Sequence, residues 1–213
     1  MTFNNVMILG DSYSTFGGYI PENYEVYYSE TSEKSDLHDV RDTWWHSLFA
    51  ETNSNLIHNN SWSGSPISYT GYGNADCSKR SSFIVRLNEL ANNGFFEKND
   101  INTIFVFGGT NDSCANSPLG ELKFSDWERE DLFNVFPAVC YLIARIKEVA
   151  PNAKLYWLIN EFLKPEIINA MITACEHYGV DFIKFKNIEM VEGHPTVIGM
   201  RDIKNQIIEY VSK

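Results

Sequence analysis

This chain alternates five short apolar runs with segments of helical periodicity, and few folds accommodate such an alternation. The runs cover residues 6–9, 56–58, 103–107, 154–159 and 181–185. They are continuously apolar, which is typical of strands buried on both faces of a parallel sheet. Strands that alternate with helices predict an α/β fold, in which helices cover both faces of the sheet.

The segments between the runs place apolar residues three or four positions apart, as a helix with one buried face does. Such stripes run through residues 44–49, 83–90, 139–149, 167–175 and 200–210. Pro165 and Gly179 bracket one of these helices, and Pro137 is expected to open another. The pattern predicts a single domain over residues 1–213, built as a three-layer α/β/α sandwich with a doubly wound parallel five-stranded sheet.

Two long segments, residues 13–40 and 109–127, do not fit the alternation. The first is rich in Tyr, Gly and Ser, and the second contains Pro118, Gly120 and Trp127. Long loops in a compact domain are often lids or binding loops, although a surface insertion without a role fits them almost equally well. We expect both loops to cover a functional site.

Charge and composition restrict the classes of partner. The formal net charge of −11 repels the phosphates of nucleic acids and anionic lipids, so we expect neither nucleic acid nor a membrane as partner. The four cysteines form no CxxC pair and the five histidines no HExxH pattern, so we expect free thiols, no metal and no cofactor. The first residues lack the pattern of a secretory signal, which predicts a cytoplasmic protein. The oligomeric state stays open.

The residues that follow the strands suggest a site, because ligands bind beyond the carboxyl ends of the strands in an open α/β sheet. The first strand ends in Gly10-Asp11-Ser12, whose small residues are expected to turn the chain and hold Ser12 exposed above the sheet. Each of the other segments is weak evidence alone, but four in this order at one sheet edge point to a site. These other segments are NNSWSGS (59–65), GGTNDS (108–113) and EGHPTVIGM (192–200).

Taken together, the four segments resemble those of the GDSL, or SGNH, hydrolase family. That family carries a serine in GDS, a glycine in its second block, an asparagine in GxND and a histidine in DxxHP. Ser12, Gly64, Asn111 and His194 match these positions. The resemblance extends from residue 5 to the last helix and implies a flavodoxin-like sheet of order 2-1-3-4-5, with an ester hydrolase activity.

The chemistry of ester hydrolysis gives each matched residue a role. A serine hydroxyl is a weak nucleophile until a base removes its proton, and His194 is the candidate base for Ser12. Attack on the carbonyl builds negative charge on oxygen, which needs donors already aimed at it. The backbone N–H groups of Ser12 and Gly64 and the side-chain amide of Asn111 are the expected oxyanion hole.

The sequence departs from the family at the acid, which lies three residues before the histidine. Val191 occupies that position and cannot orient an imidazole. Two carboxylates lie near in sequence, Glu192 and Glu189, and a backbone carbonyl that accepts from His194 is an alternative that would leave a Ser-His dyad. A displaced glutamate and the carbonyl are equally compatible with the sequence. We interpret Asp11 and Asp112, within the motifs, as structural residues that bond to backbone N–H groups.

The aromatic residues suggest a substrate class. Trp62 lies two residues before Gly64 and is expected to contact the substrate, whereas most rings of the 13–40 loop are expected to pack that loop onto the domain. Within the range of activities that the resemblance implies, we expect hydrolysis of short-chain esters, acetyl first, on a small molecule or glycan. The alternatives are a lysophospholipase or thioesterase, a non-catalytic binding relative, and a flavin or nucleotide binder of the same fold.

Overall fold

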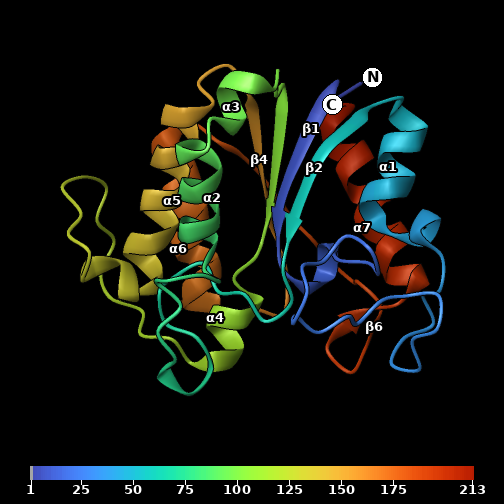
Figure 1. The fold of residues 1–213 in the computed structure, drawn as a ribbon, viewed down its shortest axis with the longest axis horizontal. Helices are drawn as coiled ribbons and strands as arrows, with labels where there is room; N and C mark the ends of the chain where they lie inside the picture. The colour runs from blue at the N-terminus through green and yellow to red at the C-terminus, as the bar shows by residue number, and fades with distance from the viewer. Residues whose placement is uncertain (1) are drawn as a thin grey trace.

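The computed structural model describes residues 2–213, and its centre is a parallel five-stranded sheet in the order β2-β1-β3-β4-β5. Figure 1 shows this sheet between two groups of helices. The predicted α/β/α sandwich is confirmed, and so is the strand order that the resemblance implied. The strands are β1 (Asn5–Gly10), β2 (Asn55–Ser61), β3 (Thr103–Phe107), β4 (Lys154–Ile159) and β5 (Asp181–Lys184).

Helices cover both faces of the sheet. α1 and α7 pack together on one face, and α2, α5 and α6 cover the other (Figure 1). Alternate side chains of β1 supply both cores: Val6 and Ile8 pack on the α1 and α7 side, and Met7 and Leu9 on the opposite side. This explains why the strand is apolar throughout. The helices are α1 (Trp44–Thr52), α2 (Phe83–Asn92), α3 (Phe95–Lys98), α4 (Thr110–Ala115), α5 (Val135–Val149), α6 (Pro165–Tyr178) and α7 (Val197–Val211).

The ends of α1 and α6 lie at residue types that commonly begin or end helices. The Thr43 side chain caps α1 by accepting a hydrogen bond from the backbone N–H three residues later. α6 starts at Pro165 and ends before Gly179, whose φ of 64° suits glycine. The prediction for α5 was wrong, because this helix begins at Val135, two residues before Pro137. Proline is tolerated there, since N–H groups of the first turn have no intrahelical acceptor.

Two further predicted boundaries were wrong. The segment 109–127 was expected to be a loop, but α4 occupies its first part, directly after Gly109, which has a φ of 94°. β2 continues to Ser61 instead of ending at residue 58. It lies at the edge of the sheet, so exposed and buried residues alternate along it and the apolar run stops early.

Two features have no predicted counterpart. A short antiparallel ribbon, β6 (Met190–Val191) paired with β7 (His194–Pro195), lies between β5 and α7. Strands of two residues are too short to show a period. Tyr210, expected on the buried face of α7, is 37% exposed, whereas Ile208 and Val211 in the same turn pack against the core.

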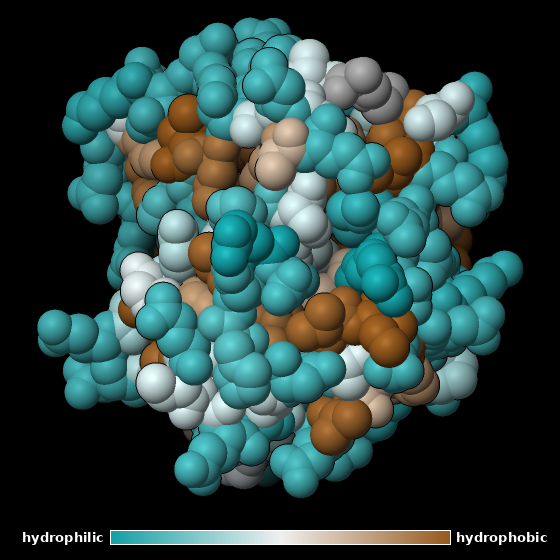
Figure 2. Space-filling view, turned by 90° about the vertical axis from the view of Figure 1, so that its right-hand side faces the viewer, coloured by the Kyte–Doolittle hydropathy of each residue, from teal (hydrophilic) through white to brown (hydrophobic). Residues whose placement is uncertain are grey.

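The carboxyl ends of the strands meet at one end of the molecule, together with α4 and β6 (Figure 1). β1 lies between β2 and β3, so the segments that follow these three strands are neighbours. The face that α1 and α7 cover is mainly hydrophilic, with separate small apolar patches (Figure 2). Among the described residues, no helix combines the length and apolar character needed to cross a bilayer.

Candidate active site

Ser12 opens a single 3-10 turn (Ser12–Ser14) directly after β1. The Asp11 carboxylate caps this turn by accepting a hydrogen bond from the N–H of Tyr13 at 3.1 Å, as its interpretation as a structural residue requires. A Cβ on Gly10 would lie 2.6 Å from the Ser61 hydroxyl oxygen, so only glycine fits where β1 turns. Ser12 itself is only 7% exposed. The expectation of an exposed serine was wrong, because the segments around it cover its side chain.

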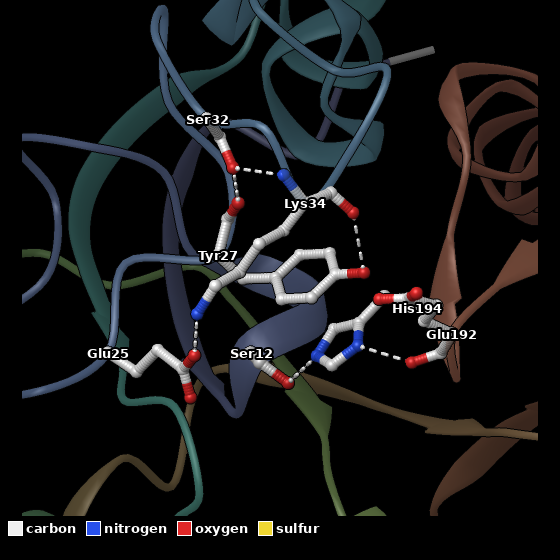
Figure 3. Close-up of polar contacts among 7 residues, drawn as sticks. All are labelled: Ser12, Glu25, Tyr27, Ser32, Lys34, Glu192 and His194. Carbon is white, nitrogen blue, oxygen red and sulfur yellow. Dashed lines mark hydrogen bonds and ion pairs between the residues drawn. The ribbon is translucent and has the colours of Figure 1, made fainter.

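His194 lies against Ser12, although the two are far apart in sequence. The Ser12 Oγ and His194 Nε2 atoms are 3.0 Å apart (Figure 3). His194 Nδ1 lies 3.3 Å from the backbone oxygen of Glu192. A carbonyl can only accept, so Nδ1 carries the proton and Nε2 is left with the lone pair that accepts from Ser12. This is the tautomer that a base acting on Ser12 needs.

The turn between β6 and β7 explains how a carbonyl reaches the imidazole. Its two central residues, Glu192 and Gly193, have φ values of 49° and 76°. Positive φ at both positions is the signature of a type I′ hairpin, the turn that matches the twist of a two-residue connection. The turn folds the Glu192 carbonyl back toward His194. A residue two positions before the histidine can therefore orient it through its backbone, although its side chain does not.

Neither glutamate suggested by the sequence places its carboxylate on His194. The Glu189 carboxylate accepts a hydrogen bond from the Thr196 hydroxyl at 2.7 Å. Glu192 is exposed and contributes its backbone oxygen only. Val191, at the position of the family's acid, is 54% exposed. Of the two alternatives that the sequence left open, the geometry corresponds to the backbone carbonyl.

We therefore expect Glu192→Gln and Glu189→Gln each to change kcat by less than about tenfold, whereas neutralising the acid of a triad costs roughly 10⁴-fold. Glutamine keeps an oxygen that can accept from Thr196, so neither variant disturbs the ribbon. Steady-state hydrolysis of p-nitrophenyl acetate measures the effect. A loss of 10³-fold or more in either variant would identify a carboxylate orienter and exclude the carbonyl.

Three tyrosines of the 13–40 segment surround the imidazole. The Tyr27 ring stacks on His194 with centroids 3.6 Å apart and planes at 13°. Tyr13 and Tyr28 meet the same ring edge-on, at 5.5 and 6.1 Å. The hydroxyls of these two tyrosines also donate to the backbone carbonyls on either side of His194. Tyr13 donates to Gly193 at 2.7 Å, and Tyr28 donates to Pro195 at 2.9 Å. These tyrosines thus fix the ribbon that carries the histidine.

The segment that carries Tyr27 is itself held in place by polar contacts (Figure 3). The Tyr27 hydroxyl donates to the backbone oxygen of Lys34 at 2.9 Å, and the Ser32 hydroxyl donates to the backbone oxygen of Tyr27 at 2.6 Å. Lys34 forms an ion pair with Glu25. The sequence signalled only a tyrosine-rich loop, and packing of that loop was the expected role. Contact with the candidate base was not foreseen.

The environment keeps His194 neutral. Burial lowers its pKa below the ordinary value of about 6.5, and the Glu192 carbonyl opposes this shift to a smaller extent. Burial disfavours the charged imidazolium, so the pKa falls. At neutral pH the ring is therefore free to accept a proton.

The expected oxyanion donors lie on three neighbouring segments. Asn111 is the second residue of α4 and is 5% exposed. Its amide donates to the Ser65 carbonyl at 3.0 Å and its oxygen accepts from the Tyr72 hydroxyl at 3.2 Å, so one amide hydrogen remains. Gly64 has a φ of 72°, which favours glycine. Among residues 2–213, the backbone N–H groups of Ser12 and Gly64 have no acceptor.

Asp112 fixes the segment after Gly64. Its two carboxylate oxygens accept from the backbone N–H groups of Ile67 and Ser68, at 2.7 and 2.9 Å. These bonds join the start of α4 to the loop that follows β2. Asp112 therefore has the structural role that the sequence suggested for it.

Trp62 belongs to a pair of aromatic rings with an arginine at each end. The ring centroids of Tyr24 and Trp62 are 4.8 Å apart, and the guanidinium carbon of Arg86 lies 5.1 Å from the centroid of the Trp62 ring. Arg80 lies 5.6 Å from the Tyr24 centroid. Trp62 is thus held by its neighbours, and Tyr24 extends the aromatic surface outward. Within the described part of the chain, no group of three or more His, Cys, Asp or Glu side chains is arranged to hold a metal ion.

Comparisons with known proteins identify the family of the chain. The profile of the GDSL-like lipase/acylhydrolase family matches residues 4–211. A GDSL-like lipase candidate from Bacteroides ovatus is 39% identical, with a TM-score of 0.90 over 98% of each chain. Another, from Bacteroides uniformis, is 39% identical with a TM-score of 0.88, over 98% of this chain and 95% of the other.

More distant structures share the fold. An acetyl xylan esterase from the rumen bacterium Butyrivibrio proteoclasticus is 16% identical, with a TM-score of 0.60 over 98% of this chain and 63% of that one. A comparison with curated proteins gives no match. The family profile covers almost the whole sequence. The chain belongs to the GDSL-like lipase/acylhydrolase family and is a serine hydrolase that acts on ester bonds.

Proposed function

We propose that this enzyme hydrolyses short-chain carboxylic esters through an acyl-enzyme on Ser12, with His194 as the base. The observation that carries the proposal is the 3.0 Å contact between the Ser12 hydroxyl and His194 Nε2. Nucleophile and base at hydrogen-bond distance, with the base oriented by a third group, are the signature of an activated serine.

The reaction has two stages, acylation of Ser12 and hydrolysis of the acyl-enzyme. The Ser12 oxygen attacks the ester carbonyl carbon while its proton passes to His194 Nε2, and the carbonyl oxygen becomes an oxyanion. The intermediate collapses by breaking the bond to the alcohol, which leaves with the proton from Nε2. Water then attacks the acyl-enzyme in the same way and releases the carboxylic acid. The N–H groups of Ser12 and Gly64 and the amide of Asn111 hold the oxyanion.

The dyad needs a substitute for what an acid does in a triad, which is to fix the tautomer and favour the imidazolium. The Glu192 carbonyl fixes the tautomer by accepting from Nδ1. The face of the Tyr27 ring, stacked on the imidazole, favours the positive charge that forms on it during attack. Tyrosine and carbonyl together supply both functions without a negative charge.

An apolar cavity next to the site fits the acyl group. Its volume is about 260 Å³, and its rim includes chain neighbours of the nucleophile, the amide donor and the base, namely Tyr13, Thr110 and Gly193. Leu163 and Met190 line its wall. At about 30 Å³ per water-sized group the cavity has room for more than an acetyl group. We therefore widen the expected acyl range from acetyl to chains of about two to six carbons.

The aromatic pair Tyr24 and Trp62 lies on two segments that also carry site residues, the 13–40 segment with Tyr27 and the loop after β2 with Gly64. Aromatic faces bind sugar rings by contact with their C–H groups, so we propose a carbohydrate as the alcohol. A sugar ester is also consistent with a net charge of −11, which disfavours anionic lipid interfaces.

A panel of esters tests the substrate class. Each methylene that enters the cavity contributes about 0.8 kcal/mol, so kcat/KM for p-nitrophenyl esters is expected to rise up to about hexanoate. It is then expected to fall at least about tenfold by decanoate, because a longer chain has to displace the cavity wall. A continued rise through decanoate would contradict a short-chain enzyme and indicate a lipase or thioesterase.

Esters that differ in the alcohol test the other side of the site. Acetylated xylo-oligosaccharides are expected to exceed p-nitrophenyl acetate in kcat/KM, and Trp62→Ala is expected to remove this advantage while sparing p-nitrophenyl acetate. Trp127→Ala is the matched control, since Trp127 is also half-buried but packs on Tyr141 of α5 and contacts neither Ser12 nor His194. Equal losses on both substrates in Trp62→Ala would show that Trp62 supports its loop and binds no sugar.

A further inference from the structure

Arg86, on α2, is a buried cation whose hydrogen bonds are complete without any carboxylate. The side chain is 1% exposed. Nε donates to the Ser81 carbonyl at 3.2 Å, and Nη1 donates to both the backbone and side-chain oxygens of Asn60 at 2.6 Å. Nη2 donates to the Gly10 carbonyl at 3.1 Å and to the Ser65 hydroxyl at 2.9 Å. All five donors of the guanidinium thus meet neutral acceptors.

A buried charge without a counter-ion is costly, so its presence calls for a reason. Two carboxylates lie within electrostatic reach, Asp11 and Glu89, but neither bonds to the guanidinium. Burial raises the pKa of Asp11 to about 7, so this carboxylate compensates Arg86 only in part. Burial also lowers the pKa of Arg86 to about 9, which leaves it charged at neutral pH.

The contacts of Arg86 fall beside each of the three expected oxyanion donors. Gly10 is two residues before Ser12, and Ser65 directly follows Gly64. The backbone oxygen of Ser65 accepts the hydrogen bond from the Asn111 amide. The guanidinium therefore bonds directly to the segments that carry Ser12 and Gly64, and it is linked to Asn111 through Ser65.

We propose that Arg86 positions the oxyanion hole and that its incompletely compensated charge stabilises the oxyanion formed during attack. The inference rests on the proposed roles of Ser12, Gly64 and Asn111. The negative charge of the tetrahedral intermediate completes the compensation of the guanidinium charge, which Asp11 provides only in part in the resting enzyme. An interaction that strengthens only in the transition state accelerates the chemical step.

Asn60→Asp tests the charge without removing the side chain. Aspartate has the shape of asparagine and keeps the oxygen that accepts from Nη1 at 2.6 Å, but it gives Arg86 a permanent counter-ion. We expect kcat to fall by about tenfold or more, with KM changed less than about threefold and no loss of thermal stability. If kcat stays within twofold of the parent value, the charge has no part in catalysis.

Asn88→Asp is the matched control. Asn88 lies two residues further along α2, and its side-chain oxygen also accepts from an arginine, Arg145 Nε at 2.9 Å. This variant adds the same charge beside another arginine, away from the donors of the hole. We expect its kcat to stay within twofold of the parent. A loss equal to that of Asn60→Asp would mean that added charge lowers kcat generally, and would overturn the inference.

A trifluoromethyl ketone gives a second readout, because serine adds to it to form a stable oxyanion. Its affinity is expected to fall in Asn60→Asp in proportion to kcat/KM, while the affinity for the product alcohol stays the same. Parallel losses for both ligands would indicate a distorted site and overturn the electrostatic role. If the parent enzyme does not bind the ketone at all, it is the proposed function that fails, independently of Arg86.

Two substitutions at Arg86 itself separate a contribution of the charge to catalysis from a role in folding alone. Arg86→Lys keeps the charge but not the five donors, and Arg86→Met loses both. Active-site titration with a phosphonate corrects each kcat for the fraction of folded enzyme. We expect corrected kcat to be at least about tenfold higher in Arg86→Lys than in Arg86→Met. Equal corrected values would restrict Arg86 to a role in folding.

Discussion

Replacing Ser12 by alanine is expected to lower kcat for p-nitrophenyl acetate by about 10⁶-fold, as loss of the nucleophile does in other serine hydrolases. The physical reason is that, among residues 2–213, Ser12 supplies the hydroxyl that contacts His194, 3.0 Å from Nε2, and no other side-chain hydroxyl does so. Without the nucleophile, water has to attack the ester directly, and only the binding and oxyanion contributions remain. Stopped assays at high enzyme concentration, with active-site titration, measure the residual rate.

Ser14→Ala is the control for this prediction. Ser14 is buried in the same turn, but its hydroxyl accepts from the Trp44 indole N–H at 3.2 Å and faces away from the base. We expect this variant to lose thermal stability and to keep kcat within about tenfold, since losing one buried hydrogen bond costs about 1 kcal/mol. If Ser12→Ala retained activity comparable with Ser14→Ala, Ser12 would not be the nucleophile.

The second large effect concerns His194. His194→Ala is expected to lose about 10⁶-fold in kcat, and the double variant with Ser12→Ala is expected to lose no more than either single variant. Nucleophile and base act as one unit, so removing the second adds nothing once the first is gone. Multiplicative losses in the double variant would show that the two residues act in separate steps.

The pH profile of the parent enzyme identifies the base. His194 has to be neutral to accept the proton, and burial lowers its pKa. Activity is therefore expected above this lowered pKa and is lost as the pH falls through it, so the acid limb of kcat/KM lies below the usual value of about 6.5. Glu25 acts on the imidazole through its charge and raises this pKa, Lys34 lowers it, and both effects are smaller than that of burial. An acid limb above 7 would contradict this balance, because it would require a carboxylate bonded directly to the imidazole.

The overall fold followed from the sequence because its signals are repeated. The run 103–107 is apolar from Ile104 to Phe107, since both faces of its strand are buried, and the helices show apolar stripes. β2 was predicted too short because an edge strand alternates. The β6 and β7 ribbon could not be predicted, because four paired residues carry no measurable period.

The four matched residues of the site were predictable because their residue types are needed for the chemistry. The group that orients His194 was not, since a backbone carbonyl leaves no side-chain signature. Its only trace in the sequence is the glycine of Glu192-Gly193, which fits the positive φ of a type I′ turn. Tyr27 and Arg86 were missed for a related reason: a tyrosine in a loop and an arginine in a helix usually have solvated or packing roles.

Absence of an acid at position 191 therefore changes how the histidine is held and leaves the reaction class the same. A carbonyl, the Tyr27 face and the hydroxyls of Tyr13 and Tyr28 replace one carboxylate. The position of the His194 imidazole therefore depends on residues of the 13–40 segment. The length of that segment, unusual for a connection within an α/β unit, has a structural reason in these contacts.

Covalent labelling tests the central claim, a Ser12 nucleophile activated by His194 alone, most directly. The parent enzyme is treated with a fluorophosphonate, digested and mapped by mass spectrometry, alongside Glu192→Gln, Glu189→Gln and His194→Ala. We expect one adduct, on Ser12, formed at comparable rates in the parent and both glutamine variants and at least about 10³-fold more slowly in His194→Ala. An adduct on another residue, or labelling that is lost with either glutamate, would contradict the dyad.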